Sequence, residues 1–350
     1  ETWDGYTKPL KSDNWDRALW DFTMASHSTG ITDHLNDFSM PILIIAGPTA
    51  VGKTDASLLL ARESGAEIVS ADSMQIYRGM DIGTAKPTRE QRSLIYHHMI
   101  DIVDPAQPYS VGDYLRDART AIDAVLSAGG VPLVVGGTGL YIRALMRGLF
   151  HGPPADIDLR EKLLQREADG GEGTLYAELE NVDAAAAVKI HPNDLRRTIR
   201  ALEVYYLRDR TISDFQREHA FRDRRYCFKL LFLARDREEL YPRIEQRVDR
   251  MIAEGLEAEV KNLFDRGYRP ELPSMQGLGY KHFMEVFLGR SSREDAVTSL
   301  KRDTKRYAKR QFTWFRREPE AIWVDVSGLS RSRTIVDEIK KSVEISNNLV

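Results

Sequence analysis

The sequence predicts an α/β protein built on a parallel sheet, with a helical insertion and a helical, basic C-terminal part. The first observation is an apolar run at residues 42–46, which ends in a glycine-rich turn and continues as a helical pattern. The second is that apolar runs at 67–71 and 131–135 alternate with helical segments, as in sheets with right-handed crossovers. The third is a change after Gly148 to Arg-, Glu- and Ala-rich helical segments, with no strand pattern before residues 226–233.

Five regions follow from these changes. Residues 1–39 show no clear periodicity and are interpreted as an N-terminal extension that is disordered or not native. The other regions are the first part of the core (40–151), a helical insertion domain (152–222), the second part of the core with basic C-terminal helices (223–328) and a tail (329–350).

The composition bounds the class of protein. The chain has 350 residues, 42% of them hydrophobic, which suffices for a substantial buried core. A single cysteine, Cys227, excludes an internal disulfide framework and cysteine-based zinc sites, and favours a reducing compartment. Apolar runs stay shorter than the roughly 18 residues of a membrane helix, and no signal-peptide pattern is present. We therefore expect a cytoplasmic protein that does not bind membranes.

Basic residues are unevenly distributed. The formal net charge is −3, yet bases gather at 196–200, 222–225 and 301–317. In the last segment, basic pairs recur every four residues from 301 to 310, which places them along one broad helical face. We interpret this face as a contact for a phosphate backbone. The alternative is a structural basic helix packed down by the aromatic residues at 312–315.

The turn after the first apolar run has the sequence GPTAVGKT (residues 47–54) and matches the phosphate-binding P-loop. Gly47 and Gly52 let the backbone curl so that several N–H groups point at one anion, and Lys53 adds a positive charge. The hydroxyl of Thr54 can bind Mg²⁺, and the following helix directs its positive dipole end at the same phosphates. A P-loop NTPase-like sheet core is therefore predicted.

The usual metal-holding acid of a P-loop ATPase or GTPase is missing. The strand at 131–135 runs into the sequence GGTG (136–139), which contains no carboxylate. Asp72, which follows the strand at 67–71, is the available acid. It is either a metal-holding group or a base that faces the substrate, and the structural alternative is a helix N-cap in a solvated loop. The N-K-x-D motif of GTPases is absent.

Several motifs together resemble one family, the tRNA dimethylallyltransferases. The resemblance covers roughly residues 40–325, and motifs in this order make coincidence implausible. The motifs are GPTAVGKT (47–54), SADSMQIYRGMDIGTAKP (70–87), VGGTGLY (135–141), HPNDLRRTIRALEV (191–204), MQGLGYK (275–281) and YAKRQFTWF (307–315).

The resemblance implies transfer of a dimethylallyl group from its diphosphate to N6 of adenine 37 in tRNAs that read U-starting codons. The P-loop would then hold a leaving diphosphate, with Mg²⁺ on Thr54, which explains the missing ATPase acid. The residues expected at the diphosphate are Gly47, Pro48, Thr49, Ala50, Val51, Gly52, Lys53, Thr54, Arg243 and Arg247.

The resemblance also assigns the acceptor side. Asp72 is implied to be the general base for the adenine amine, and Thr138 to contact substrate near the diphosphate, its alternative being a turn hydroxyl. The adenine would be flipped into a pocket reached from the opposite end to the donor. The residues implied to contact tRNA are Asp72, Ser73, Met74, Gln75, Thr138, Arg160, Arg196, Arg197, Thr198, Ile199, Arg200, Gln276, Gly279, Tyr280 and Lys281. The alternative for any one arginine is a solvated helix face.

Other functions remain open at this point. The nearest is an isopentenyltransferase acting on free AMP, ADP or ATP, and the next is a P-loop kinase of a small metabolite. A nucleic-acid-binding module without chemistry is disfavoured by Asp72 and the complete P-loop. No obligate protein partner is expected, and the predicted state is a monomer.

Overall fold

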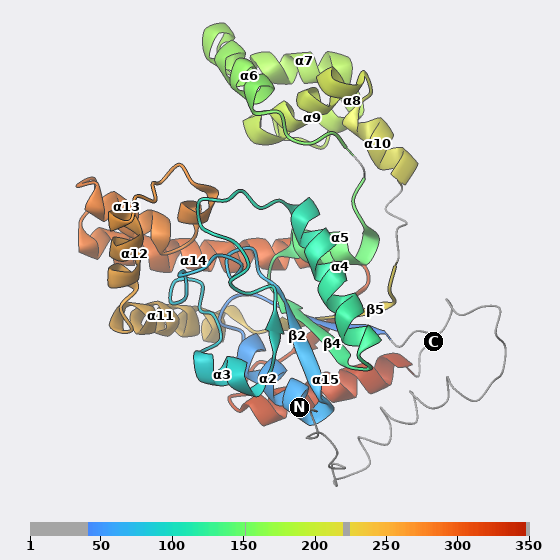
Figure 1. Ribbon diagram of the computed structural model, residues 1–350, viewed down its shortest axis with the longest axis vertical. Coiled ribbons are helices and arrows are strands. Elements are labelled where there is room, and N and C mark those ends of the chain that lie inside the picture. Colours follow the sequence, from blue (N-terminus) through green and yellow to red (C-terminus); the bar gives the residue numbers. More distant parts are fainter. Residues whose placement is uncertain (1–40, 151, 220–224, 348–350) are drawn as a thin grey trace, which may run out of the picture. The chain divides into compact units, whose positions relative to one another are not determined.

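The computed structural model describes residues 41–150, 152–219 and 225–347. The chain forms two compact units (Figure 1). The insertion unit is Met146–Arg225, and the core unit comprises the chain before and after it. These bounds lie within a few residues of the predicted insertion at 152–222. The predicted extension at 1–39 lies outside the described residues.

The core unit contains a six-stranded parallel sheet with the order β3-β2-β4-β1-β5-β6. The apolar runs predicted as strands at 42–46, 67–71, 131–135 and 226–233 are confirmed. The short edge strand β3 was not predicted, because two residues carry no readable alternation. The strands are β1 (Ile42–Ala46), β2 (Ala66–Ala71), β3 (His97–His98), β4 (Val131–Gly136), β5 (Phe228–Ala234) and β6 (Ala321–Asp325).

The register of the sheet aligns three strand ends. Ala46, the last residue of β1, pairs with Gly136 at the end of β4, and Gly136 pairs on its other side with Ala71 at the end of β2. The P-loop, the turn at 137–139 and Asp72 follow these three residues directly. Because the strands are parallel, all three segments leave the sheet at its carboxyl edge, where ligands of open α/β sheets bind.

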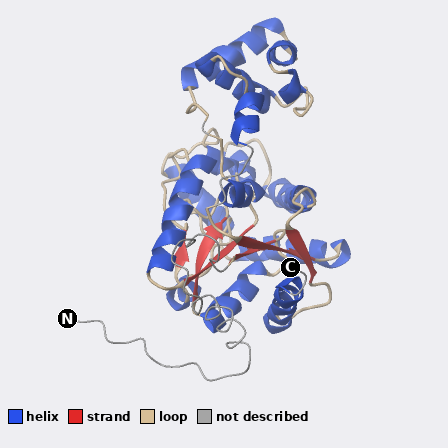
Figure 2. Ribbon diagram, turned by 90° about the vertical axis from the view of Figure 1, so that its right-hand side faces the viewer, coloured by secondary structure: helices blue, strands red, loops and turns tan. Residues whose placement is uncertain are grey.

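Helices cover both faces of the sheet, as Figure 2 shows. Ile45 belongs to a hydrophobic cluster with α2 (Lys53–Ser64) and α15 (Ser332–Asn347). Ile44 points to the opposite face, because successive side chains of a strand alternate, and it is also fully buried. A strand buried on both faces is apolar throughout, and this is why β1 reads as a continuous run.

The remaining helices of the core unit include a group that packs on the segment after β2. Met80 and Ile76 of this segment join a second hydrophobic cluster with side chains of these helices. The group consists of α11 (Arg237–Ala253), α12 (Leu256–Asp265), α13 (Tyr280–Phe287) and α14 (Arg293–Phe315), with the 3₁₀ turn η1 (Pro273–Gln276). The other core helices are α3 (Arg89–Leu94), α4 (Val111–Ser127) and α5 (Gly139–Arg147), which reaches the unit boundary.

The insertion unit is helical, as predicted from its composition. Its core is formed by leucines such as Leu163, Leu179 and Leu202, which the solvent does not reach. Its helices are α6 (Ile157–Gly170), α7 (Thr174–Val182), α8 (Ala184–Ala187), α9 (Leu195–Arg208) and α10 (Ile212–His219). Throughout the described residues, no helix combines the length and apolar character needed to cross a membrane.

The C-terminal segment differs from the prediction. Most of residues 329–350, expected as a tail, form α15, which packs against α2. Ile335, Val336 and Ile339 are buried in the same cluster as the sheet. Their spacing of one and three residues is that of an apolar helix face, a signal too short to separate from a tail by sequence alone.

We predict that Ile339→Ala lowers the free energy of unfolding by about 2–4 kcal/mol, because Ile339 is 1% exposed and the substitution leaves a cavity. Ile345→Ala is the matched control on the same helix, since Ile345 is 52% exposed and its loss should change the free energy by about 0.5 kcal/mol or less. Urea unfolding measures both variants. Equal effects of the two substitutions would contradict a packed α15.

Candidate active site

A pocket of ≈ 360 Å³ lies at the carboxyl edge of the sheet and receives the three segments that the register aligns. Its volume is in the range of small-molecule sites. A second pocket of ≈ 470 Å³ shares Lys53, Thr54 and Arg247 with it. Polar residues that line the first pocket include Thr49, Lys53, Thr54, Asp72, Ser73, Gln75, Arg247, Gln276, Lys281, Tyr307, Arg310 and Gln311.

The backbone of the P-loop depends on its glycines. A Cβ at Gly47 would lie 2.8 Å from the carbonyl oxygen of Leu233, so a side chain there would displace the loop from β5. Gly52 has a φ of +110° and stands at the N-cap of α2 without a side-chain cap. The first N–H groups of α2 are therefore open to an anion, as in other phosphate-binding helix ends.

Lys53 is the half-buried lysine of the P-loop. Its Nζ donates to the carbonyl oxygens of Gly47 and Pro48, both at 2.8 Å. Burial and, to a smaller extent, the positive charge of Arg247 lower the pKa of Lys53 to about 7, against the opposing effect of the Asp72 carboxylate. A charged Lys53 is thus disfavoured until an anion offsets its burial.

Two arginines of α11 lie beside the P-loop, and their contact with the diphosphate stays a prediction. Arg243 donates through Nε to the carbonyl oxygen of Ala50 at 3.0 Å. Arg247 lines both pockets, and burial lowers the pKa of its guanidinium. Arg247 and Lys53 therefore place two cations at the predicted diphosphate position.

Asp72 forms a tight turn at the end of β2. Its Oδ1 accepts hydrogen bonds from the N–H of Met74 at 2.9 Å and of Gln75 at 3.4 Å. The structural alternative, a turn-capping carboxylate, thus accounts for one oxygen. The other oxygen, Oδ2, makes no hydrogen bond within the described part of the chain, and Asp72 lines the pocket. One side chain can therefore stabilise the turn and still accept a proton.

Thr138 links the β4 turn to the turn of Asp72. Its Oγ1 accepts from the N–H of Ser73 at 3.0 Å and lies 3.3 Å from the Ser73 hydroxyl. Its own N–H donates to the carbonyl oxygen of Ala71 at 3.1 Å. Thr138 is thus held against the turn of Asp72, and its hydroxyl has protein partners as in the turn-hydroxyl alternative. Its contact with substrate stays a prediction.

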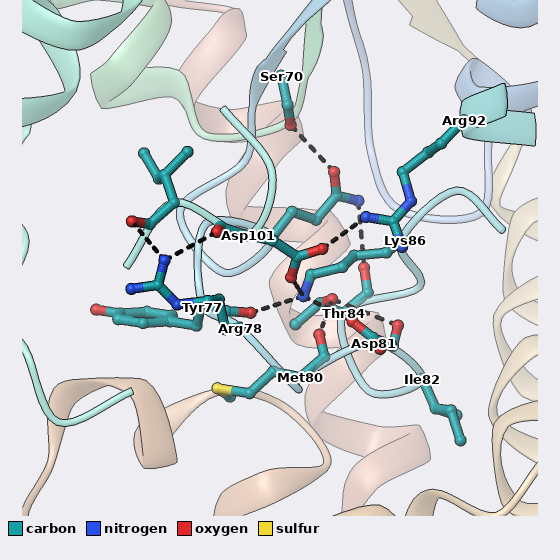
Figure 3. A network of polar contacts seen from close by, with 12 residues as sticks. Ser70, Tyr77, Arg78, Met80, Asp81, Ile82, Thr84, Lys86, Arg92 and Asp101 are labelled. Atoms are coloured by element: carbon teal, nitrogen blue, oxygen red, sulfur yellow. Dashed lines mark hydrogen bonds and ion pairs between the residues drawn. The ribbon is translucent and has the colours of Figure 1, made fainter. Parts of the chain in front are cut away.

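The segment after Asp72 is fixed by internal polar contacts (Figure 3). The Ser70 hydroxyl donates to Oε1 of Gln75 at 3.0 Å, and Nε2 of Gln75 lies 3.4 Å from the carbonyl oxygens of Thr84 and Ala85. The amide of Gln75, predicted to contact the acceptor base, therefore has protein partners on both of its polar atoms.

A buried lysine holds the next turn of the same segment. Lys86 donates to the carbonyl oxygen of Tyr77 at 2.6 Å, to Asp81 at 2.8 Å and to Asp101 at 2.6 Å. Arg92 also pairs with Asp101 at 2.6 Å (Figure 3). Because charged groups are costly to bury unless paired, this network fixes one conformation of the segment.

Glu259 of α12 clamps the segment from the other side. Its carboxylate accepts from the N–H groups of Asp81 and Ile82 at 2.8 Å and of Gly83 at 3.1 Å. It also accepts from the hydroxyl of Tyr280 at 2.6 Å. Tyr280, predicted to contact tRNA, is fully buried and has this internal partner.

Three other predicted tRNA residues lie close to Tyr280 in sequence: Gln276, Gly279 and Lys281. Gly279 has a φ of +90° at the start of α13, which explains glycine there by backbone geometry. Lys281 and Gln276 line the pocket, and Lys281 donates to Asp303 at 3.2 Å. Of these predicted tRNA residues, the structure therefore brings Lys281 and Gln276 to the site.

The predicted tRNA residues of the insertion unit fall into two groups. Arg160 and Arg200 both pair with Glu203, whose side chain is fully buried, at distances of 2.5–2.9 Å. Thr198 and Ile199 are buried, because they lie on the face of α9 that packs into the unit. Their predicted contact with tRNA does not fit this burial. Two neighbours on α9 are exposed: Arg196 and Arg197.

The basic face of α14 is partly neutralised. Lys301 pairs with Asp249 of α11 at 2.6 Å, and Lys305 pairs with Glu245 of the same helix. The aromatic residues that follow pack the helix down, as the structural alternative predicts: Phe312 and Phe315 both contact the Phe232 ring, with centroid distances of 5.5 and 4.7 Å. Arg302 and Arg306 pair with Asp303 of the same helix at 3.2 and 3.4 Å, and the phosphate contact of α14 stays a prediction.

The donor set suits a magnesium ion that binds with substrate. Within the described residues, no group of three His, Cys, Asp or Glu side chains could hold a metal alone. The Thr54 hydroxyl and the Asp72 carboxylate line the same pocket. Mg²⁺ prefers oxygen ligands and is commonly held by one or two protein groups together with phosphates and water. The residues present therefore fit the ion predicted at Thr54.

Three side chains that organise these units have no sequence signature: Glu203, Glu259 and Gln311. Each has at least one partner 43 or more positions away in the chain: Arg160 for Glu203, Gly83 for Glu259 and Thr49 for Gln311. A polar residue in a helical pattern is normally predicted to be exposed to solvent, because the pattern does not reveal a partner that is distant in sequence. An acid or amide on the apolar side of a helix is the one available hint.

Comparison with known proteins agrees with this geometry. The family description "IPP transferase" matches residues 75–318, and "Isopentenyl transferase" matches residues 40–96. A tRNA dimethylallyltransferase of Syntrophobacter fumaroxidans is 49% identical over 303 residues, which cover 85% of this chain and 89% of that protein. Another, of Thermotoga maritima, is 50% identical over 289 residues, or 82% and 93% of the two chains.

Solved structures give the same result. A tRNA isopentenylpyrophosphate transferase of Bacillus halodurans has a TM-score of 0.62 and 38% identity, covering 88% of this chain and all of that one. A eukaryotic dimethylallyltransferase acting on tRNA has a TM-score of 0.72 and 29% identity, covering 89% and 79%. On sequence identity and on fold, the chain belongs to the tRNA dimethylallyltransferase (IPP transferase) family.

Proposed function

We propose that this protein transfers the dimethylallyl group of dimethylallyl diphosphate to N6 of adenine 37 in tRNA, with release of diphosphate. One observation carries the proposal: the P-loop and Asp72 converge on one pocket beside a strand end, Gly136-Gly137, that has no carboxylate. A phosphate cradle without the ATPase acid suits a leaving diphosphate better than a hydrolysed nucleotide. Relatives of about half-identical sequence are named tRNA dimethylallyltransferases.

The P-loop side stabilises the leaving group. As the C–O bond of the donor breaks, negative charge grows on the diphosphate and the allylic carbon becomes cationic. Lys53, Arg247 and the N–H groups at the start of α2 can neutralise that charge from fixed positions. Mg²⁺ on Thr54 and on the diphosphate would supply further positive charge when bound.

The acceptor side positions a weak nucleophile. The amine of adenine becomes acidic as its nitrogen bonds to the allylic carbon, and Oδ2 of Asp72 can accept the released proton. The turn bonds through Oδ1 hold the carboxylate in place, so little ordering is needed during the reaction. The balance is one C–O bond broken, one C–N bond formed and one proton moved to Asp72.

For the acceptor we propose tRNA that reads U-starting codons, with adenine 37 flipped out of its stack. The proposed contacts with tRNA are the exposed Arg196 and Arg197 and, at the pocket, Lys281 and Gln276. Arg160 and Arg200, 40% and 31% exposed while paired with Glu203, can present their remaining donors to phosphates. We also propose a monomer in the cytoplasm.

The experiment that tests this function offers the protein several acceptors. Mass-tagged dimethylallyl diphosphate is incubated with Mg²⁺ and with unmodified tRNA, AMP or ATP, and each product is analysed for the five-carbon group. We expect the label on tRNA at adenine 37. Label on AMP or ATP alone would instead identify an adenylate isopentenyltransferase. Transfer of phosphate from ATP to a small metabolite would identify a kinase.

We predict that Asp72→Asn lowers kcat of transfer by about 10²- to 10⁴-fold, because the amide keeps an Oδ1 acceptor for Met74 but cannot accept a proton at the other position. Diphosphate affinity should stay within a few-fold of wild type. Asp104→Asn is the matched control, since Asp104 Oδ1 accepts from the N–H of Ala106 at 2.9 Å in a similar turn outside the pocket. Wild-type kcat in Asp72→Asn would remove Asp72 as the base.

We predict that diphosphate binding takes up a proton at Lys53. Because the pKa of Lys53 is about 7 in the free protein, the side chain is mostly neutral at about pH 8, and a bound anion restores its charge. Calorimetry at about pH 8 in buffers of different ionisation enthalpy should detect this uptake in wild type. Affinity should fall as pH rises through 7.

The variant Lys53→Met distinguishes proton uptake by Lys53 from proton uptake by the diphosphate itself. Uptake by the diphosphate is the same for wild type and variant. The variant should bind diphosphate more weakly at about pH 6.5, and its proton uptake at about pH 8 should be smaller. Equal proton uptake in wild type and variant would show that Lys53 is already charged in the free protein.

A further inference from the structure

Gln311 of α14 is a buried amide, 5% exposed, that reaches the carboxyl edge of the sheet. Its Oε1 accepts from the N–H of Thr49 in the P-loop at 3.0 Å. Its Nε2 donates to the carbonyl oxygen of Gly137, directly after β4, at 3.0 Å. One side chain therefore spans the loop that follows β1 and the loop that follows β4.

We call the contacts of Gln311 with Thr49 and Gly137 the Gln311 bridge. Further hydrogen bonds connect this bridge to the acceptor side of the pocket. Thr138, next to Gly137, accepts the N–H of Ser73, which is the neighbour of Asp72. A continuous series of short polar contacts thus runs from the P-loop through Gln311 and the β4 turn to the turn of Asp72. The sheet aligns the three strand ends, but these contacts fix the loops beyond them.

Gln311 packs closely against Gly137 and lies on a well-packed helix. A Cβ at Gly137 would lie 2.3 Å from Nε2 of Gln311, so the backbone approaches the amide as closely as glycine allows. The helix that carries Gln311 is anchored by the buried Ala308 and Phe315 on either side of it. A side chain on a packed helix holds its position better than one on a loop.

The chemistry of the bridge requires an amide. One acceptor is needed for the N–H of Thr49 and one donor for the carbonyl oxygen of Gly137. Asparagine and glutamine supply both from one neutral group. A glutamate would set its second carboxylate oxygen against the Gly137 carbonyl and add negative charge beside the diphosphate.

We propose that Gln311 is a positioning residue that sets the separation between the diphosphate cradle and the groups that hold the adenine. The inference rests on the proposed function, because that reaction joins a carbon from one side to a nitrogen from the other. Reacting atoms must approach to about 3–3.5 Å, and a misplacement of about 1 Å can cost about 10²-fold in rate. Gln311 acts through Thr49 and Gly137, and the reacting atoms need not touch it.

The experiment compares Gln311→Met, which keeps the length and loses both bonds, with Gln311→Glu. We expect Gln311→Met to lower kcat of transfer to tRNA by about 10- to 100-fold. KM for tRNA and the melting temperature should stay close to wild type. Gln311→Glu should lower kcat and also weaken binding of Mg²⁺-diphosphate, measured by calorimetry. Tyr226→Phe is the control for loss of hydroxyl hydrogen bonds outside the pocket, to Asp123 and the carbonyl oxygen of Arg119.

A double-mutant cycle tests the bridge itself. Thr138→Val removes the next link, so its effect on kcat should be smaller in the Gln311→Met background than in wild type. Additive effects, a wild-type kcat in Gln311→Met, or a loss that tracks the unfolded fraction would each overturn the inference while wild type remains active. If wild type transfers nothing to tRNA, the proposed function fails and the inference fails with it.

Discussion

The structure depends on the parallel register that brings Ala46, Gly136 and Ala71 into line at one edge of the sheet. Neighbouring strands lie about 4.8 Å apart, so the P-loop and the turn of Asp72, two strands apart, begin about 10 Å from each other. That interval suits a donor held by its diphosphate at one side and an acceptor base at the other. Helices pack their apolar side chains on both faces of the sheet and stabilise this register. The strand spacing therefore sets the width of the site.

The charges that line the space between the P-loop and Asp72 determine which ligand binds there. Lys53 and Arg247 are half-buried basic side chains, and burial lowers the pKa of both. The carboxylate of Asp72 favours their charged forms but lies across the pocket on the acceptor side. A bound diphosphate would compensate both cations directly, so the free energy of burying them is recovered on binding.

Local patterns predicted the sheet and the loops at its carboxyl edge. The runs that became β1, β2 and β4 carry strong local signals, and glycines plus one acid mark the loops behind them. The parts that sequence could not predict are long-range. Glu259 and Gln311 bind segments 174 or more positions away in the chain, and nothing in their own neighbourhood indicates this. For Thr198 and Ile199, a motif placed them at tRNA, whereas the helix period buries them.

Helix α14 joins both halves of the proposed function in one rigid element. Tyr307 and Gln311 face the pocket, whereas the adjacent Arg306 and Lys309 are exposed. A phosphate backbone bound along the outer face would therefore press on the helix that spans the two loops inside. Free AMP offers the same adenine to the pocket but no polymer for that face. Under the proposed function, α14 and the insertion unit would discriminate between tRNA and a free nucleotide, because the two acceptors share the base that enters the pocket.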